Sequence, residues 1–126
     1  MILPEPHILR IFHDAQLRRF GGAPGVIDLG RLDAAVGRVR SALAYRQDLD
    51  AVDAAAMLCH SLLKAHAFVD GNKRTAYGAM VMTLAEAGLR IEASDEDLAQ
   101  MIWTAAGSGD GYEAIAAWLR PRVATR

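Results

Sequence analysis

The sequence predicts an all-α fold, a compact single-domain bundle of about six helices that spans residues 1–126. Apolar residues make up 52% of the chain, with many alanines and few runs of β-branched residues, a composition that favours packed helices. Apolar positions also recur at steps of three and four along most segments. At most expected helix ends the sequence has a proline, a glycine or a short polar residue, the types that begin and end helices.

Two helices are expected in the first part of the chain, joined by a glycine- and proline-rich loop over residues 21–28. The first is expected from about Pro4 to Phe20, where Gly21 can end it. Asp28 is expected to cap the second, because a short carboxylate accepts hydrogen bonds from the free N–H groups of a first turn. The first helix is predicted from the helical spacing of Ile8, Ile11, Phe12 and Ala15. The second is expected to pack inward along the stripe Leu29, Leu32, Val36, Val39 and Leu43.

Two central helices follow. A cap at Asp50 is expected to open the third helix, which carries Cys59 in its buried part and ends at His66. The fourth is expected over residues 72–87, with Gly88 ending it. Its run 76–85 has no charged side chain, so this helix is expected to be buried almost all round.

The last part of the chain predicts a short extended segment over residues 89–92 and two more helices. Ser94 followed by Asp97 resembles a capping box and is expected to open the fifth helix. A loop over residues 107–111 ends it, and Asp110 is expected to cap the sixth, before a basic tail. The predicted buried side chains are Leu98, Met101, Ile102 and Ala105 in the fifth helix and Ile115, Trp118 and Leu119 in the sixth.

Charge and composition limit the classes of function. The formal net charge of -1 gives no electrostatic basis for nucleic-acid binding, and Arg31, Arg38 and Arg40 are expected at the surface of the second helix. A single cysteine excludes an internal disulfide and a cysteine-rich metal site. No apolar run approaches the ~20 residues that a membrane span needs, and no targeting signal is evident. We therefore expect a soluble protein of the cytoplasm.

The residues with chemical potential lie together in His66–Thr75, at the junction between the third and fourth helices. Gly71 allows a tight turn, after which residues 72–74 form a first helical turn whose free N–H groups and positive dipole end suit an anion. Lys73 and Arg74 add two positive charges, and a guanidinium can bind a phosphate bidentately. The pattern favours a polyphosphate ligand.

Two further side chains of this stretch suit catalysis. Asp70 is a hard oxygen ligand that could hold Mg²⁺ against phosphate oxygens. Histidine is the residue type whose ordinary pKa, about 6.5, lies nearest neutral pH, so we expect His66 to be the side chain best able to take a proton from a hydroxyl. Phe68 lies between them and is expected to anchor the loop in the core.

Each of these signals also has an ordinary structural interpretation. A histidine at a helix end is often a capping or packing residue, Asp-Gly is a common turn, and a Lys-Arg pair is often a solvated surface. The pair His13 and Asp14 could suggest catalysis too, but neighbours on a helix point about 100° apart, which disfavours it. The convergence of complementary roles at one junction favours a functional site.

This stretch resembles the Fic/Doc family, whose signature runs His-x-Phe-x-Asp/Glu-Gly-Asn-Gly/Lys-Arg. Seven positions match, namely His66, Phe68, Asp70, Gly71, Asn72, Lys73 and Arg74. Adenylylating members have glycine at position 73 and a second arginine at position 77, where this chain has lysine and tyrosine. Both differences resemble the Doc branch, the toxins of Phd/Doc toxin–antitoxin systems, and residues 12–15, 21–25 and 37–40 are also similar to it.

The resemblance implies an all-α Fic/Doc fold and a toxin that transfers the γ-phosphate of ATP to a threonine or serine hydroxyl of a translation factor, elongation factor Tu. It implies that His66 activates the hydroxyl, that Asp70 binds Mg²⁺, and that Gly71, Asn72, Lys73 and Arg74 hold the phosphates. Two alternatives stay open: AMP transfer to a protein hydroxyl, and a catalytically silent domain that binds a nucleotide or an antitoxin.

The resemblance also implies how the activity is restrained. Many Fic enzymes carry an inhibitory helix with the pattern Ser/Thr-x-x-x-Glu, and no such spacing occurs in this sequence. Restraint is then expected from a Phd-type antitoxin whose C-terminal segment folds as a helix into a groove near the active site, as unstable partners can do.

Overall fold

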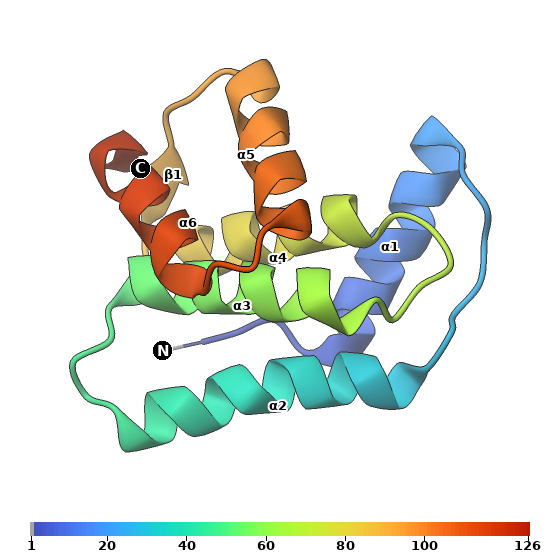
Figure 1. Cartoon of the computed structure of the whole chain (residues 1–126), viewed down its shortest axis with the longest axis horizontal. Helices are drawn as coiled ribbons and strands as arrows, with labels where there is room; N and C mark the ends of the chain where they lie inside the picture. The colour runs from blue at the N-terminus through green and yellow to red at the C-terminus, as the bar shows by residue number, and fades with distance from the viewer. Residues whose placement is uncertain (1) are drawn as a thin grey trace.

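The computed structural model describes residues 2–126 and confirms the predicted helical fold class. Within these residues six α-helices surround one apolar core, and two short strands close the C-terminal end (Figure 1). The elements are α1 Pro6–Phe20, α2 Leu29–Tyr45, α3 Ala51–Ala65, α4 Asn72–Glu86, β1 Leu89–Ile91, α5 Asp95–Gly107, α6 Tyr112–Leu119, the 3₁₀ turn η1 Arg120–Arg122 and β2 Val123–Thr125.

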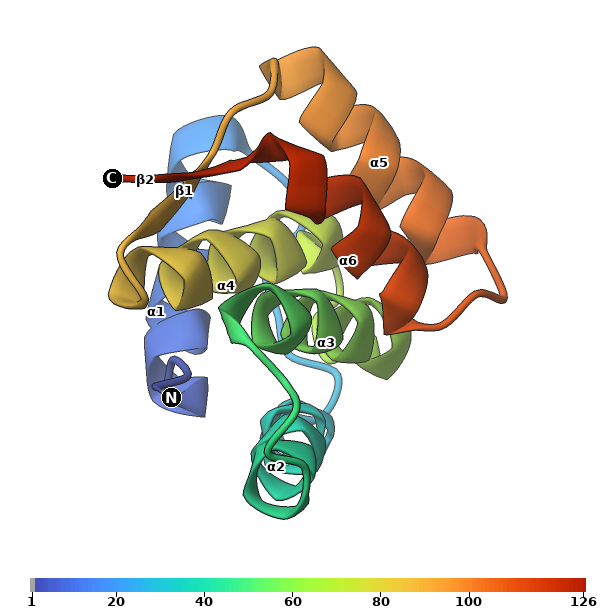
Figure 2. The same ribbon diagram turned by 90° about the vertical axis from the view of Figure 1, so that its left-hand side faces the viewer.

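Helix α3 forms the centre of the bundle. It contacts α2 on one side and α4, α5 and α6 on others, as the two views show (Figures 1 and 2). Alanines at positions 54–56 are fully buried, and their small side chains let neighbouring helices approach closely. Cys59 is buried as predicted, and burial raises the pKa of its thiol to about 12, because a thiolate would be poorly solvated there.

Helix α4 lies beside α3 and is buried on nearly every side, as predicted from its uncharged run. Between Thr75 and Ala85 only Tyr77 is exposed, and its exposed fraction is 37%. Gly78 permits the contact with α1, because a Cβ at that position would collide with the ring of Phe12. This packing fixes the N-terminal end of α4, where the phosphate-binding residues are predicted.

The four apolar residues whose spacing predicted α1 are only partly covered, and of these Phe12 and Ala15 are half-buried. Ile8 and Ile11 are 40% and 59% exposed, whereas Leu9 and His13 are buried. The ring of His13 packs inward on Phe68, far along the chain, a contact that a hydrophobic pattern does not reveal. The helix also begins at Pro6 with Glu5 as its N-cap, two residues later than expected.

Three of the other four predicted helix N-caps are confirmed. Asp28, Asp50 and Ser94 accept hydrogen bonds from first-turn N–H groups, so these three caps are confirmed. Leu29, expected inside, is 44% exposed, and it is the first residue of α2. The cap predicted at Asp110 was wrong: Gly111 is the N-cap of α6, and the Asp110 N–H instead donates to Ser108 Oγ in a preceding turn (2.9 Å).

The basic tail expected after α6 is ordered. It forms η1 and then β2, which pairs antiparallel with β1 so that Leu89 faces Thr125 and Ile91 faces Val123 (Figure 2). The segment predicted to be extended over residues 89–92 therefore has a partner strand that the sequence did not indicate.

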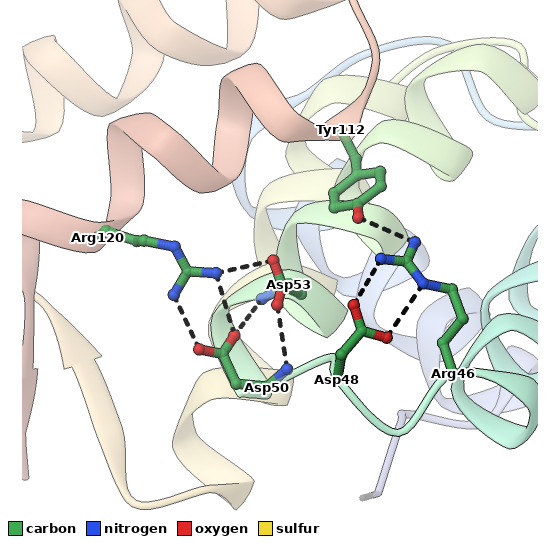
Figure 3. A network of polar contacts seen from close by, with 6 residues as sticks. All are labelled: Arg46, Asp48, Asp50, Asp53, Tyr112 and Arg120. Atoms are coloured by element: carbon green, nitrogen blue, oxygen red, sulfur yellow. Dashed lines mark hydrogen bonds and ion pairs between the residues drawn. The ribbon is translucent and has the colours of Figure 1, made fainter.

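A polar network joins the α2–α3 connection to the C-terminal part of the bundle (Figure 3). The guanidinium of Arg120 donates to Asp50 (2.8 Å) and to Asp53 (2.8 Å), and these two carboxylates form the capping box of α3. Arg120 holds the pKa of the Asp50 carboxyl at about 2. Beside them Arg46 donates to Asp48 and to the hydroxyl of Tyr112.

No helix in residues 2–126 has the length and apolar character needed to cross a membrane.

Candidate functional site

The site begins where α3 ends, at His66. This residue is the C-cap and has φ 50° and ψ 51°, the one positive φ of a non-glycine residue among those described. The left-handed conformation stops the helix and turns the chain away from its axis. The His66 side chain is exposed, so it is accessible to a ligand.

The loop after His66 is held by a buried side chain and by hydrogen bonds to its backbone. Phe68 is 1% exposed, which confirms the predicted anchor. The side chain of Asn72 accepts from the Phe68 N–H (3.1 Å) and donates to the Phe68 carbonyl (2.8 Å). Asn72 was predicted to bind phosphate; its side chain is occupied by the loop, so what it offers to an anion is its backbone N–H.

His13, which lies on α1, supports the loop between His66 and Gly71 from its buried side, a role that the sequence did not reveal. Its ring stacks on Phe68 with centroids 3.7 Å apart, and its Nε2 donates to the Asp70 carbonyl (2.7 Å). The expectation that His13 and Asp14 point apart was wrong, because Nδ1 and the Asp14 carboxylate lie 3.1 Å apart. His13 is nonetheless 1% exposed, so it positions the loop and does not meet a substrate.

The glycine-rich segment 21–28 forms one wall of the site. It pairs with the loop through Ile27 N–H to Ala67 O (2.8 Å) and Val69 N–H to Gly25 O (3.2 Å). Gly22 approaches the carboxylate closely, because a Cβ there would lie 2.9 Å from Asp70 Oδ2. Sequence reasoning predicted a loop here but gave no sign that it borders the site.

Asp70 is an exposed carboxylate fixed by backbone donors. Gly71 N–H donates to Oδ1 (2.8 Å) and Ala23 N–H to Oδ2 (3.2 Å). These bonds, Gly71 first, hold the pKa of the Asp70 carboxyl below its ordinary value, with a smaller contribution from the charge of Arg74. The group is ionised at neutral pH, and each oxygen keeps a lone pair for a further ligand.

The N-terminal end of α4 faces the same space. Gly71 has φ 80°, and a Cβ there would lie 3.2 Å from His13 Cδ2, so a glycine fits this turn best. Among the described residues, the N–H groups of Asn72, Lys73 and Arg74 have no hydrogen-bond partner, and the first bonded amide is that of Thr75. Three free donors at a positive helix end form an anion site.

The two cations of this turn lie against aromatic rings. Lys73 Nζ is 4.9 Å from the ring centroid of Trp103, and Arg74 Cζ is 5.0 Å from that of Phe20. Neither forms an ion pair with a carboxylate in residues 2–126. Their charges are therefore available to an anionic ligand.

The structure brings all six predicted residues into one cleft of about 540 Å³ between α1, α4 and the two loops; hereafter it is called the phosphate cleft. Its predicted site residues are His66, Asp70, Gly71, Asn72, Lys73 and Arg74. No group of three or more His, Cys, Asp or Glu in the described chain could hold a metal alone. A metal here would depend on Asp70 and on phosphate oxygens, an arrangement typical of Mg²⁺ with nucleotides. Asp70 fits that role, because its carboxylate is charged and exposed.

Comparisons with known proteins place the chain in a family. The Fic/DOC family model matches residues 3–84. The chain is 35% identical to "Protein kinase doc" of Escherichia phage P1 over 116 residues, 92% of this chain and 91% of that protein. It is 40% identical to "Toxin Doc" of Mycolicibacterium smegmatis over 106 residues, 79% of each chain. A family match over more than half of the chain and these two relatives show that the protein belongs to the Fic/DOC family.

Proposed function

We propose that this protein is a Doc-type toxin and a protein kinase of the cytoplasm. It would use ATP and Mg²⁺ to transfer the γ-phosphate to a threonine or serine hydroxyl of a translation factor, elongation factor Tu, and so arrest translation. The names of the two relatives, one a kinase and one a toxin, support this function. The observation that carries it is the phosphate cleft, where a base, a carboxylate, free amides and two cations meet.

In this mechanism each site residue has a separate role in one displacement at the γ-phosphorus. His66 takes the proton of the acceptor hydroxyl as its oxygen forms a bond to the γ-phosphorus. The bond from that phosphorus to the β–γ bridging oxygen breaks, and ADP leaves. The free amides at the start of α4, with Lys73 and Arg74, bind the phosphate oxygens and stabilise the charge that spreads over them.

Asp70 would hold the metal. Mg²⁺ bound there would neutralise charge on the leaving phosphates. The two backbone donors fix the orientation of the Asp70 carboxylate before any ligand arrives, and His13 fixes the backbone that carries it. Such preorganisation matters because phosphoryl transfer depends on position and charge rather than on covalent chemistry of the protein.

The composition of the cleft supports phosphate rather than AMP transfer. The position of the second arginine of adenylylating relatives is Tyr77, which lines a neighbouring groove between α4 and α5 and not the phosphate cleft. Lys73 stands where those enzymes have glycine, and its side chain extends over Trp103. The cleft therefore has one guanidinium, that of Arg74, and one ammonium, that of Lys73, in place of the two arginines that bind phosphates in adenylylating relatives.

A Phd-type antitoxin is the proposed restraint. The groove between α4 and α5 has a volume of about 350 Å³, is lined by Leu98, Ile102 and Trp103, and borders the phosphate cleft at Lys73 and Arg74. An amphipathic helix of the antitoxin would find an apolar surface there beside the two cations. Co-expression of the neighbouring open reading frame should rescue growth, and continued arrest would contradict this partner.

The direct test of the function uses ATP labelled at either the γ- or the α-phosphate, incubated with total bacterial protein. We expect His66-dependent label from the γ position alone. Label from the α position would show AMP transfer. Absence of label from both would favour the silent binding domain. His66→Ala is the inactive variant, and His60→Ala is its control because His60 lies on the same helix and outside the phosphate cleft.

A further inference from the structure

A second cleft meets the phosphate cleft at His66. It has a volume of about 650 Å³ and lies between the N-terminal half of α2 and the C-terminal end of α3. His66 contributes to both clefts, and no other residue does. A general base must contact the acceptor hydroxyl on one side while the phosphate lies on the other, so a cleft across His66 is where an acceptor would enter. We call it the acceptor cleft.

The acceptor cleft is strongly basic in a chain whose net charge is -1. Arg31, Arg38 and Lys64 line it, with Asp28 as its single carboxylate. Among the described residues none of the three cations has an ion pair with a carboxylate. Arg40, which also lies on α2, instead pairs with Glu5 at the start of α1 (2.8 Å). The three cations of the cleft therefore carry charge that no carboxylate of the described residues neutralises.

Neutral acceptors hold these cations in place. Arg31 Nη1 donates to the His66 carbonyl (3.4 Å), Arg38 Nη2 to Ser61 Oγ (3.4 Å), and Lys64 Nζ to the Ser108 carbonyl (2.6 Å). The two arginines lie seven residues apart on α2, which places both on one face of that helix. Their side chains therefore extend toward α3, one at the catalytic histidine and one nearer the middle of the helix.

The chemistry of the cleft distinguishes between anionic occupants. A second polyphosphate is disfavoured, because Asp28 occupies the amide end of α2 by accepting from Gly30 N–H (2.7 Å). A nucleic acid is also disfavoured, because no Phe, Tyr or Trp side chain lines the cleft to stack a base. A protein segment with acidic side chains is favoured, because the cleft presents three cations and only one carboxylate of its own. The charges of such a segment and of the cleft are complementary.

We propose that the acceptor cleft binds the acceptor protein through acidic side chains that flank the modified hydroxyl, and that Arg38 and Lys64 select for them. This inference rests on the proposed kinase function and adds its substrate class. The cations raise the encounter rate and fix the register of the segment, so that its hydroxyl lies at His66. Arg31, which contacts the backbone of His66, also supports the base itself.

The test compares the double variant Arg38→Gln/Lys64→Gln with a matched control, Arg10→Gln/Arg18→Gln, whose two cations also have no ion pair among the described residues. The control removes two exposed cations outside both clefts. The acceptor is purified elongation factor Tu, or the protein that takes His66-dependent label if that is a different one. We expect the double variant to raise KM for the acceptor about tenfold and to leave kcat and KM for ATP within about twofold.

Two more measurements sharpen the outcome. The kcat/KM of the parent should fall with rising salt, more steeply than that of the double variant. A hexaglutamate peptide should compete with the acceptor, and a transfer RNA should not. An unchanged acceptor KM in a variant that melts like the parent, or competition by RNA alone, would overturn the inference. Absence of label with the parent protein would instead refute the kinase function on which it rests.

Discussion

His13 offers the sharpest test of how the site is built, because it supports the loop that carries Asp70 and does not itself line the phosphate cleft. We consider His13→Leu, which keeps a buried side chain of similar size but removes the donor to the Asp70 carbonyl (2.7 Å) and the stack on Phe68 (3.7 Å). Leaving a partly buried carbonyl without a donor costs about 1–3 kcal/mol. Loss of the ring stack adds about 0.5–1.5 kcal/mol. The free energy of unfolding should therefore fall by about 2–4 kcal/mol.

The same substitution should impair catalysis in the variant that remains folded. Asp70 follows the loop backbone, and a displacement of about 1 Å at a catalytic group can cost on the order of a hundredfold in rate. We expect kcat for label transfer to fall about tenfold to a hundredfold, with KM for the acceptor little changed. His13→Gln, which can still donate to the carbonyl, should retain more of both quantities.

The assays are urea denaturation at pH 7 and phosphate transfer at a temperature where every variant is folded. If His13→Leu lost less than about 0.5 kcal/mol and kept the kcat of the parent, His13 would not hold the loop.

Three further predictions concern the metal, the polar network and the antitoxin groove. Asp70→Asn should lower kcat about a hundredfold and abolish its dependence on Mg²⁺ concentration, with little change in melting temperature; retained Mg²⁺ dependence would place the metal elsewhere. Because Arg120 lowers the pKa of the folded Asp50 carboxyl to about 2, its stabilisation is present above about pH 4 and lost as pH falls toward 2. The Asp50 side chain is 55% exposed, so Arg120→Leu should cost only about 1 kcal/mol at pH 7, and urea denaturation should show that difference shrinking at pH 2. Trp103→Ala should weaken antitoxin binding in titration calorimetry about tenfold or more; unchanged affinity would exclude the α4–α5 groove as its binding surface.

The sequence predicted the parts of this fold that depend on neighbouring residues. The caps at Asp28, Asp50 and Ser94 are local hydrogen bonds within one turn, so residue type and spacing sufficed to place them. The six site residues also lie close together along the chain, within one turn and the helix that follows. Their common location in one cleft therefore needed no knowledge of long-range packing, although their chemical roles stay predictions.

The parts that the sequence did not predict depend on contacts between distant segments. His13 lies 57 residues from Asp70, and its polar side chain was not expected in the buried face of α1. Gly22 borders the carboxylate only because the segment 21–28 pairs with the loop after α3. The sequence predicted only a basic tail after the sixth helix and not the strand β2, because the strand with which β2 pairs lies more than thirty residues earlier. The hydrophobic periodicity and composition of a segment predict the structure of that one helix or strand. The contacts described here form between two segments that are distant in the sequence, so neither signal predicts them.

The central claim is that the phosphate cleft transfers phosphate to a protein hydroxyl through His66. Mass spectrometry of elongation factor Tu from cells that express the parent, His66→Ala or His60→Ala tests it most directly. We predict a phosphothreonine or phosphoserine with the parent and His60→Ala, and none with His66→Ala. An AMP adduct, or the same phosphorylation with His66→Ala, would contradict it.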